Sequence, residues 1–210
     1  AAISGYEGQP TTRAALLLSA LLFQRPGNVR HMEWAELDLV AGMWTIPSAK
    51  MKRRVHEKNN GRPHLVPLAL QAVELLRELW PLTGGGRYVF PSLHGKGRPM
   101  SENTLRTALR RLGYSNEEMT PHGFRAMART IMVERLAVTA DVIEAQLAHI
   151  KSGPLGAAYD RAEYMQQRKE MMDRWASFLL PDSTSVESDG QTRRGSDLKR
   201  ANPAVGMATL

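Results

Sequence analysis

The sequence predicts a mostly helical domain with a small three-stranded antiparallel sheet, an α+β fold. Apolar residues recur at helical spacing in several segments, such as "ALQAVELLRELW" and "SENTLRTALRRLG", a pattern typical of helices that bury one face. Two short runs, "MWTIP" and "HLVPL", have the composition of strands, and the loop between them contains Asn-Asn-Gly, a turn signal. The chain has 210 residues, of which 42% are hydrophobic, and can bury one sizeable core.

The first expected helix covers residues 11–23, where two candidate N-caps, Thr11 and Thr12, precede a dense apolar run. A second helix is expected over 69–80, and it should stop at Pro81 because proline breaks the hydrogen-bond ladder. Its buried face should carry Ala72, Leu75, Leu76 and Leu79.

A third helix over 101–113 should begin at a Ser101 cap and close on Gly113. Leu105, Leu109 and Leu112 should lie on its buried face. The remaining helices are expected over 121–135, 141–147 and 163–179.

Three short strands are expected, over 43–47, 64–68 and 87–90. From residue 181 onward the chain is rich in Ser, Gly, Asp and Pro and shows no periodicity, so the folded part should end near Leu180. We expect the 181–210 tail to be disordered or to dock on a partner. The chain starts without a methionine, and we expect that a preceding domain is absent from this fragment.

The charge of the chain favours a polyanionic partner. The net charge is +7 and the isoelectric point is about 10.0, and clustered Lys and Arg replace counterions on a phosphate backbone. The 181–210 tail is neutral, since it holds four basic and four acidic residues. The whole excess therefore lies in residues 1–180, where a functionally silent basic surface remains the alternative.

The chain has no cysteine, which excludes disulfides and thiolate metal sites. No apolar run reaches the roughly 18 residues of a membrane span, and the first residues show no charged segment followed by an apolar one. We expect an intracellular, cytoplasmic protein that acts without a membrane.

The segment "TPHGFR" (120–125) suits phosphate binding. Thr120 is a good N-cap and Pro121 suits the first helical position. His122 and Arg125, three residues apart, would flank a helix N-terminus whose free N–H groups attract anions. Taken alone, the segment fits equally well a capped helix with one His and one Arg on its surface.

Two further basic segments are candidates for phosphate chemistry. Arg25 lies between the first helix and a Pro-Gly turn, where its forked donors could grip two phosphate oxygens or bind backbone carbonyls. Arg30 is its competitor. The loop over 48–63 is rich in bases, and one lysine could protonate a leaving alkoxide if neighbouring cations lower its pKa.

The chain resembles the catalytic domain of tyrosine recombinases, the phage integrase family. The resemblance lies in the order of its candidate residues, which is Arg25, a hairpin lysine, His122 with Arg125, His149 and Tyr159. The resemblance covers about residues 8–180. The segments "RPGNVR", "MKRR", "HLVPL", "PHGFRA", "IEAQLAH" and "AAYDRA" are most similar to integrases of genomic islands and satellite phages.

The resemblance implies that Arg25 and Arg125 hold the non-bridging oxygens of the scissile phosphate. It implies that His149 hydrogen-bonds the same phosphate; His149 stands in "LAH", where the family often has Leu-Gly-His. Asn28 departs from the family, in which many relatives carry an acid after Pro-Gly. That departure concerns a supporting contact rather than the phosphate clamp.

The resemblance also implies that Tyr159 is the nucleophile, that His122 assists its proton transfer and that a hairpin lysine is the general acid for the 5′-oxygen. We favour Lys52 over Lys50, because Lys52 follows Met51 in the pattern "MK". A phenol with a pKa near 10 is a weak nucleophile, yet arginines and imidazoles around a phosphodiester can stabilise the phenolate and the phosphorane. We expect no metal and no cofactor. Tyr164 is expected to pack in the core.

The resemblance implies that residues 1–180 form a DNA breaking-rejoining domain of a site-specific recombinase that integrates or excises a mobile element. The expected partners are double-stranded attachment sites and accessory DNA-bending or excision factors. The protein is expected to form a homotetramer on DNA, and the isolated domain is expected to be a monomer. DNA contacts are expected from Lys50, Arg53, Arg54 and Lys58.

Three alternatives stay open from the sequence. A type IB topoisomerase uses a similar set of residues without strand exchange. A non-catalytic or regulatory DNA-binding module would keep the basic surface and lose catalysis. A metal-dependent nuclease or phosphatase is disfavoured, because the six histidines are far apart in sequence and no metal-binding motif is present.

The basic charge predicts that DNA binding weakens steeply with salt. If about six phosphates are contacted, the affinity should fall on the order of 10³-fold between 50 and 200 mM salt, because each contact releases counterions. Titration of a fluorescent duplex at several salt concentrations measures this slope. A flat response would contradict the nucleic-acid assignment.

Overall fold

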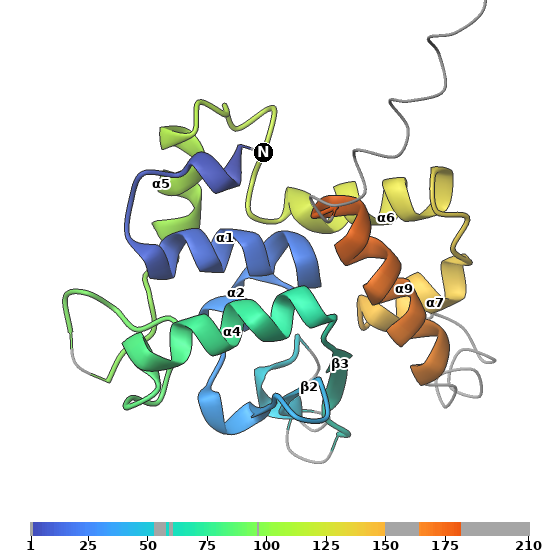
Figure 1. The fold of residues 1–210 in the computed structure, drawn as a ribbon, viewed down its shortest axis with the longest axis horizontal. Coiled ribbons are helices and arrows are strands. Elements are labelled where there is room, and N and C mark those ends of the chain that lie inside the picture. Colours follow the sequence, from blue (N-terminus) through green and yellow to red (C-terminus); the bar gives the residue numbers. More distant parts are fainter. Residues whose placement is uncertain (1, 53–57, 59–60, 96, 150–163, 182–210) are drawn as a thin grey trace, which may run out of the picture. The chain divides into compact units, whose positions relative to one another are not determined.

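The computed structural model describes residues 2–52, 58, 61–95, 97–149 and 164–181. The chain divides into two units, Ala1–Leu180 and Pro181–Leu210, and only Pro181 of the second unit lies among the described residues. The first unit is mostly helical with one three-stranded antiparallel sheet (Figure 1), which confirms the predicted fold class. Its α-helices are α1 (Pro10–Leu22), α2 (Pro26–Arg30), α4 (Leu70–Thr83), α5 (Thr104–Arg111), α6 (Gly123–Glu134), α7 (Ala140–Gln146) and α9 (Met165–Leu179).

A hairpin forms most of the sheet. Strand β2 (Met43–Ile46) pairs with β3 (His64–Pro67), and Trp44 lies opposite Val66. The two short strand-like runs that were predicted are therefore confirmed. Trp44, Ile46 and Val66 are buried, because alternate residues of a strand point to the same face and here that face packs against the helices.

The third strand differs from the prediction. It is β1 (Leu37–Asp38), which pairs with β2, whereas residues 87–90 stay outside the sheet. Tyr88 forms only an isolated bridge with Glu33, and the Val89 N–H donates to the Met32 carbonyl at 3.0 Å. Because β1 already occupies the free edge of β2, the 87–90 segment pairs with the chain just before the sheet.

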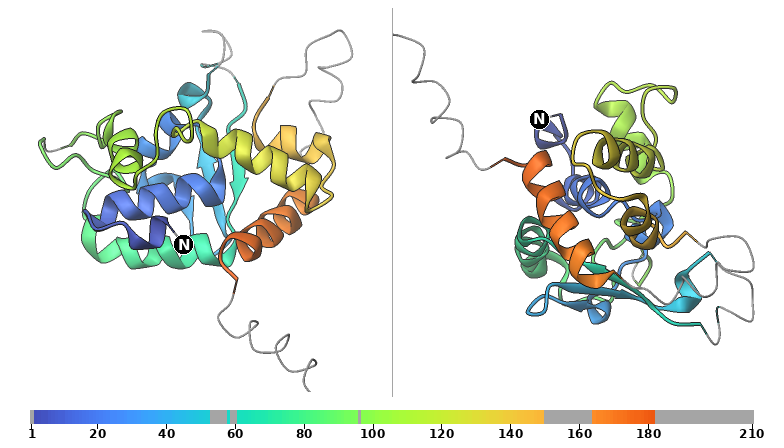
Figure 2. Two further views of the ribbon diagram at one scale, coloured as in Figure 1. Left: turned by 90° about the horizontal axis from the view of Figure 1, so that it is seen from above. Right: turned by 90° about the vertical axis from the view of Figure 1, so that its right-hand side faces the viewer.

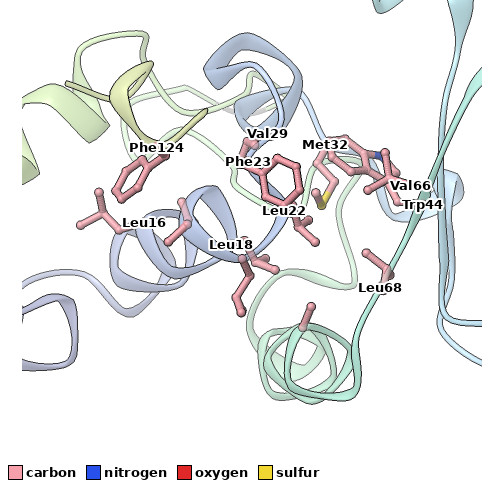
Figure 3. Packing of buried hydrophobic residues seen from close by; sticks show 14 of the residues in the cluster. Leu16, Leu18, Leu22, Phe23, Val29, Met32, Trp44, Val66, Leu68 and Phe124 are labelled. Carbon is pink, nitrogen blue, oxygen red and sulfur yellow. The ribbon is translucent and has the colours of Figure 1, made fainter. Parts of the chain in front are cut away.

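Helix α1 lies at the centre of the core. Nine of its 13 residues are buried, so it packs on nearly all sides, as its dense apolar run predicts. Figure 3 shows Leu16, Leu22 and Phe124 among the buried side chains around this helix. The Trp175 ring of α9 meets Phe23 edge to face at 6.2 Å, and its indole N–H donates to the Ala20 carbonyl at 2.9 Å.

Several helix ends differ from the predictions. Helix α4 runs through Pro81 to Thr83: a proline so close to the helix end removes few hydrogen bonds, and the Thr83 hydroxyl donates to the Val89 carbonyl while the Thr83 carbonyl accepts from Trp34 Nε1. The Pro-Gly turn expected after Arg25 is instead a five-residue helix, α2, which begins at Pro26.

The capping residues also differ. Gln9 occupies the N-cap position of α1 without a side-chain hydrogen bond, and Pro10 lies in the first turn. The N-cap position of α5 is Asn103 rather than the predicted Ser101. The predicted stop at Gly113 agrees with its φ of 90°, because glycine adopts this left-handed conformation without strain.

A partly buried ion-pair cluster fixes the start of the hairpin. The Lys50 ammonium donates to Glu33 at 2.7 Å, to Glu36 and to the His31 carbonyl at 2.8 Å. Glu33 also accepts two hydrogen bonds from Arg87, and these, above all, lower the pKa of Glu33 from 4.5 to about 2 despite burial, which acts in the opposite direction.

Among the described residues, no helix is both long enough and apolar enough to cross a membrane. Helices α6, α7 and α9 lie together on one side of the unit, where α7 packs against both α6 and α9 and α9 also packs against β3 (Figures 1 and 2). The ends of α1 and α7 and the start of α6 position the polar residues of the candidate site.

Replacing Glu33 should destabilise the fold in a pH-dependent way. The folded-state pKa of Glu33, about 2, lies below the ordinary value of 4.5, so its stabilising effect is complete above pH 4.5 and is lost as the pH falls toward 2. Near pH 7, Glu33→Gln should lower the free energy of unfolding by about 1–2 kcal/mol, after allowance for solvent screening.

Urea unfolding of the parent and of Glu33→Gln, followed from neutral to acidic pH, tests this expectation. The difference between the two chains should shrink as the pH falls, whereas Glu74→Gln on the exposed face of α4 should match the parent throughout. A difference that does not change with pH would contradict the assignment.

Candidate active site

A buried guanidinium lies at the centre of the candidate site. Arg125 in the first turn of α6 is 4% exposed, and its Nη1 donates to the Phe23 carbonyl while its Nη2 donates to the Leu147 carbonyl, both at 2.9 Å. Burial, with a smaller effect from Arg25, lowers the pKa of Arg125 to about 10. The group is still charged at neutral pH, so the structure holds a cation in a largely dry place.

The two carbonyls that bind Arg125 come from helix ends with unusual backbone. Phe23, the C-cap of α1, has a φ of 40°, and Ala148, just after Leu147, has a φ of 50°. At the end of α7, the Ala148 N–H donates to Ala145 O at 3.2 Å and the His149 N–H donates to Glu144 O at 3.1 Å. This pair of bonds is a Schellman motif, with alanine at the position that usually holds glycine.

A buried polar network fixes the end of α7 against its neighbours. The Gln146 carbonyl accepts a hydrogen bond from Gln24 Nε2 at 2.8 Å and lies 3.1 Å from His64 Nε2. The Gln146 side-chain oxygen accepts from Arg168 Nε of α9 at 2.8 Å. Since Gln24, His64, Gln146 and Arg168 are all buried, the network leaves the residues after Gln146 little freedom to shift.

His149 lies between an arginine and a carboxylate. Its Nε2 is 3.0 Å from Arg125 Nη2, and its Nδ1 is 2.5 Å from Glu144 Oε2. The other oxygen of Glu144 accepts from Arg129 Nε at 2.8 Å. Burial raises the pKa of Glu144, but the hydrogen bonds from Arg129 and His149 outweigh it, so that the pKa is lowered overall.

The positive side chains gather around His122. This residue is the N-cap of α6, and its pKa is lowered, chiefly by burial and then by the nearby charges of Arg125, Arg25, His149 and Lys52. A lowered pKa keeps the imidazole neutral at pH 7, so it can accept a proton. The sequence-predicted Arg25, Lys52, His122, Arg125 and His149 are thus brought together from four separate parts of the chain.

Thr120 differs from its predicted role as N-cap, since the helix begins two residues later than expected. Its hydroxyl nevertheless accepts a hydrogen bond from the Gly123 N–H at 3.1 Å, which satisfies one of the free donors of the helix start. Arg125 turns inward to the carbonyls while His122 is only partly covered and stays exposed, so the two side chains do not lie on one exposed face.

The two hairpin lysines have different surroundings. Lys50 is held by Glu33 and Glu36, whereas Lys52 is exposed and its charge reaches His122. Between them Met51 is 2% exposed, and the Asn28 amide donates to its sulfur at 3.6 Å. The buried Met51 therefore anchors the chain at the point where Lys52 begins to project.

Other predicted site residues have no described place or a different one. Tyr159, Arg53 and Arg54 lie outside the described residues. Lys58 is half-buried, and its carbonyl accepts from the Ser48 hydroxyl at 2.6 Å. Arg30, the competitor of Arg25, donates to the Met100 carbonyl at 3.0 Å, which is a structural role.

Sequence reasoning missed the residues that support the site, namely Glu144, Gln146, Gln24 and Arg168. Glu144 has the only local signal, because a helix that ends before His149 brings the acid close to it. The contact between Gln146 and Arg168 joins residues 22 positions apart, and no spacing rule predicts it. Among the described residues, no group of three or more His, Asp or Glu side chains is arranged to hold a metal ion.

Comparisons with known proteins point to one family. The model described as "Phage integrase family" matches residues 5–164. The putative protein IntB of Escherichia coli (strain K12) is 37% identical over 184 residues, which cover 84% of this chain and 46% of that protein. The integrase of Enterobacteria phage P4 is 37% identical over 186 residues, covering 85% of this chain and 42% of that integrase. The chain thus spans less than half the length of these relatives.

A solved structure has the same fold. The integrase from mycobacterium phage Brujita superposes with a TM-score of 0.62 at 18% identity, covering 83% of this chain and 54% of that chain. At this identity the likeness establishes the fold alone.

Replacing Arg125 by lysine should destabilise the protein although the charge is kept. A single ammonium cannot bind the Phe23 and Leu147 carbonyls as the two guanidinium nitrogens do, and a buried carbonyl without its donor costs about 1–3 kcal/mol. Chemical denaturation should show a loss of this size for Arg125→Lys and almost none for Arg129→Lys, whose side chain is 54% exposed. Equal stability of the two variants would contradict this account.

Proposed function

The chain belongs to the phage integrase family, and from this premise we propose that it is the catalytic part of a site-specific DNA recombinase. It cleaves and rejoins DNA through a 3′-phosphotyrosine and thereby integrates or excises a mobile element. The observation that carries the proposal is the gathering of cationic side chains around His122. A phosphodiester under attack accumulates negative charge, which a preorganised set of cations stabilises.

Arg25 and Arg125 hold the non-bridging oxygens of the scissile phosphate. Two Arg125 donors are used by the Phe23 and Leu147 carbonyls, which fixes the plane of the guanidinium. An arginine has five N–H donors, so Arg125 keeps others for a phosphate oxygen. His149 lies beside Arg125 Nη2 and contacts the same phosphate.

Tyr159 is the nucleophile in this proposal. Its hydroxyl oxygen forms a bond to phosphorus while the bond from phosphorus to the 5′-oxygen breaks. His122 accepts the phenol proton, for which its lowered pKa suits it. Lys52 gives a proton to the leaving 5′-oxygen, and the charge that a metal ion supplies in other phosphoryl transfers comes here from arginine and histidine.

Double-stranded attachment sites are the proposed substrate, and the protein acts on them in the cytoplasm. Arg53, Arg54 and Lys58 contact the DNA backbone. Lys50 is left out of this set, because its ammonium binds Glu33 and Glu36. The protein acts as a homotetramer on paired sites, together with accessory DNA-bending or excision factors.

Incubation with nicked attachment-site DNA tests the proposal. The parent should form a covalent adduct that runs slowly on a denaturing gel, and mass spectrometry should place the DNA on the peptide that contains Tyr159. Tyr159→Phe should form none, because it lacks the attacking oxygen. Tyr164→Phe is the matched control and should form adduct like the parent, since Tyr164 packs against the core.

The outcomes separate the competing functions. An adduct without strand exchange between two sites would indicate a topoisomerase-like activity. DNA binding without adduct would indicate a non-catalytic module, and adduct formation by Tyr159→Phe would contradict the assignment of the nucleophile.

A further inference from the structure

The end of α7 brings an acid and a histidine together through the backbone. In its Schellman motif the His149 N–H donates to the Glu144 carbonyl. Glu144, the third-last residue of α7, and His149, the third residue after this helix, therefore face each other. An apolar contact usually accompanies this motif. Here the contact is polar, between Glu144 Oε2 and His149 Nδ1 at 2.5 Å.

The partners of His149 determine which ring nitrogen carries the proton. A guanidinium has donors only, so His149 Nε2, which is 3.0 Å from Arg125 Nη2, must offer its lone pair. Glu144, whose pKa is lowered, is ionised at neutral pH and accepts only, so Nδ1 must carry the hydrogen. Both contacts therefore select the same tautomer.

We propose that Glu144 is a positioning residue, which holds His149 as the Nδ1–H tautomer and supplies the negative charge that stabilises the protonated ring when a phosphate enters. The inference rests on the proposed function. A lone pair on Nε2 would repel an anionic phosphate oxygen, so the contact requires a proton on Nε2. That proton comes from solvent, Nδ1 keeps its own, and the positive charge of the ring is balanced by the Glu144 carboxylate.

The charged groups around His149 act in opposite directions. The Arg125 guanidinium of α6 disfavours a second positive charge beside it, whereas the Glu144 carboxylate of α7 favours that charge. Arg129 of α6 forms an ion pair with the other oxygen of Glu144 and so weakens this effect. Arg25 and Lys52, whose charges reach the neighbouring His122, add to the positive surroundings of the site. Glu144 is thus the carboxylate that makes an imidazolium acceptable beside two other basic groups.

The tautomer can be measured without DNA. In the full chain labelled with ¹⁵N-histidine, the ring nitrogen shifts of His149 should report Nδ1–H in the parent at neutral pH. Glu144→Ala should show a mixture with a clearly detectable share of Nε2–H, because only the contact with Arg125 then still favours Nδ1–H. Arg129→Gln is the matched control, because it removes the other partner of Glu144 and leaves the contact with His149, so the parent pattern should persist. An Nε2–H ring in the parent, or an unchanged tautomer in Glu144→Ala, would overturn the proposal.

The effect of the negative charge of Glu144 can be measured through the pH profile of adduct formation. Glu144→Gln keeps the size of the side chain and removes the charge, so its adduct should form more slowly, with a deficit that grows to on the order of 10-fold or more as the pH rises from about 6 to about 8. Glu134→Gln, at the exposed end of α6, should follow the parent. A deficit of the same size at every pH would indicate a merely structural role and would overturn the charge assignment.

The two experiments separate the inference from the proposed function. If the parent forms no adduct while the DNA-free tautomer responds to Glu144→Ala as expected, the recombinase assignment fails and the positioning of His149 stands. If the parent forms adduct and Glu144→Gln matches it at every pH, the recombinase assignment stands and the inference is wrong.

Discussion

The candidate site depends on the hydrogen bonds from the Arg125 guanidinium to two backbone carbonyls. One bond joins α6 to the end of α1, across 102 positions of sequence, and the other joins it to the end of α7. Arg25 follows the first carbonyl by two residues and His149 follows the second by the same interval. The buried Arg125 side chain therefore fixes the spacing between Arg25 and His149, which come from distant parts of the sequence. Burying a cation is costly unless it is fully hydrogen-bonded, so the helix ends that satisfy it are held in place as well.

Like charges are gathered at the same place, and the fold compensates for their repulsion with neighbouring acids. Glu144 neutralises part of the charge beside His149, and Glu33 and Glu36 hold Lys50 away from it. A set of cations preorganised in this way is unfavourable by itself and becomes favourable when a polyanion enters. The same electrostatic arrangement accounts for both the repulsion within the free site and the phosphate binding that we propose for it.

Much of the fold could be predicted from the sequence, because helical periodicity and strand composition are local signals. The buried faces of α4 and α5 and the β2–β3 hairpin follow from them. The role of residues 87–90 could not be predicted, because no local signal shows that β1, and not this segment, pairs with the free edge of β2. For the site, ordered motifs indicated Arg25, His122, Arg125 and His149, but the Gln146 and Arg168 contact depends on packing between distant helices. The difference between Lys50 and Lys52 likewise arises from carboxylates that lie elsewhere in the chain.

Ala148 shows how a backbone conformation can constrain a sequence independently of chemistry. Its φ of 50° is one that glycine adopts freely and that costs an alanine about 1 kcal/mol. The glycine that the family often carries before this histidine thus has a conformational explanation, because the turn that delivers His149 requires a left-handed residue whatever the reaction. A chain with alanine there keeps the turn but has a smaller reserve of stability. With less stability in reserve, the chain should tolerate fewer destabilising substitutions elsewhere, so a residue that touches no substrate limits how far the rest of the sequence can change.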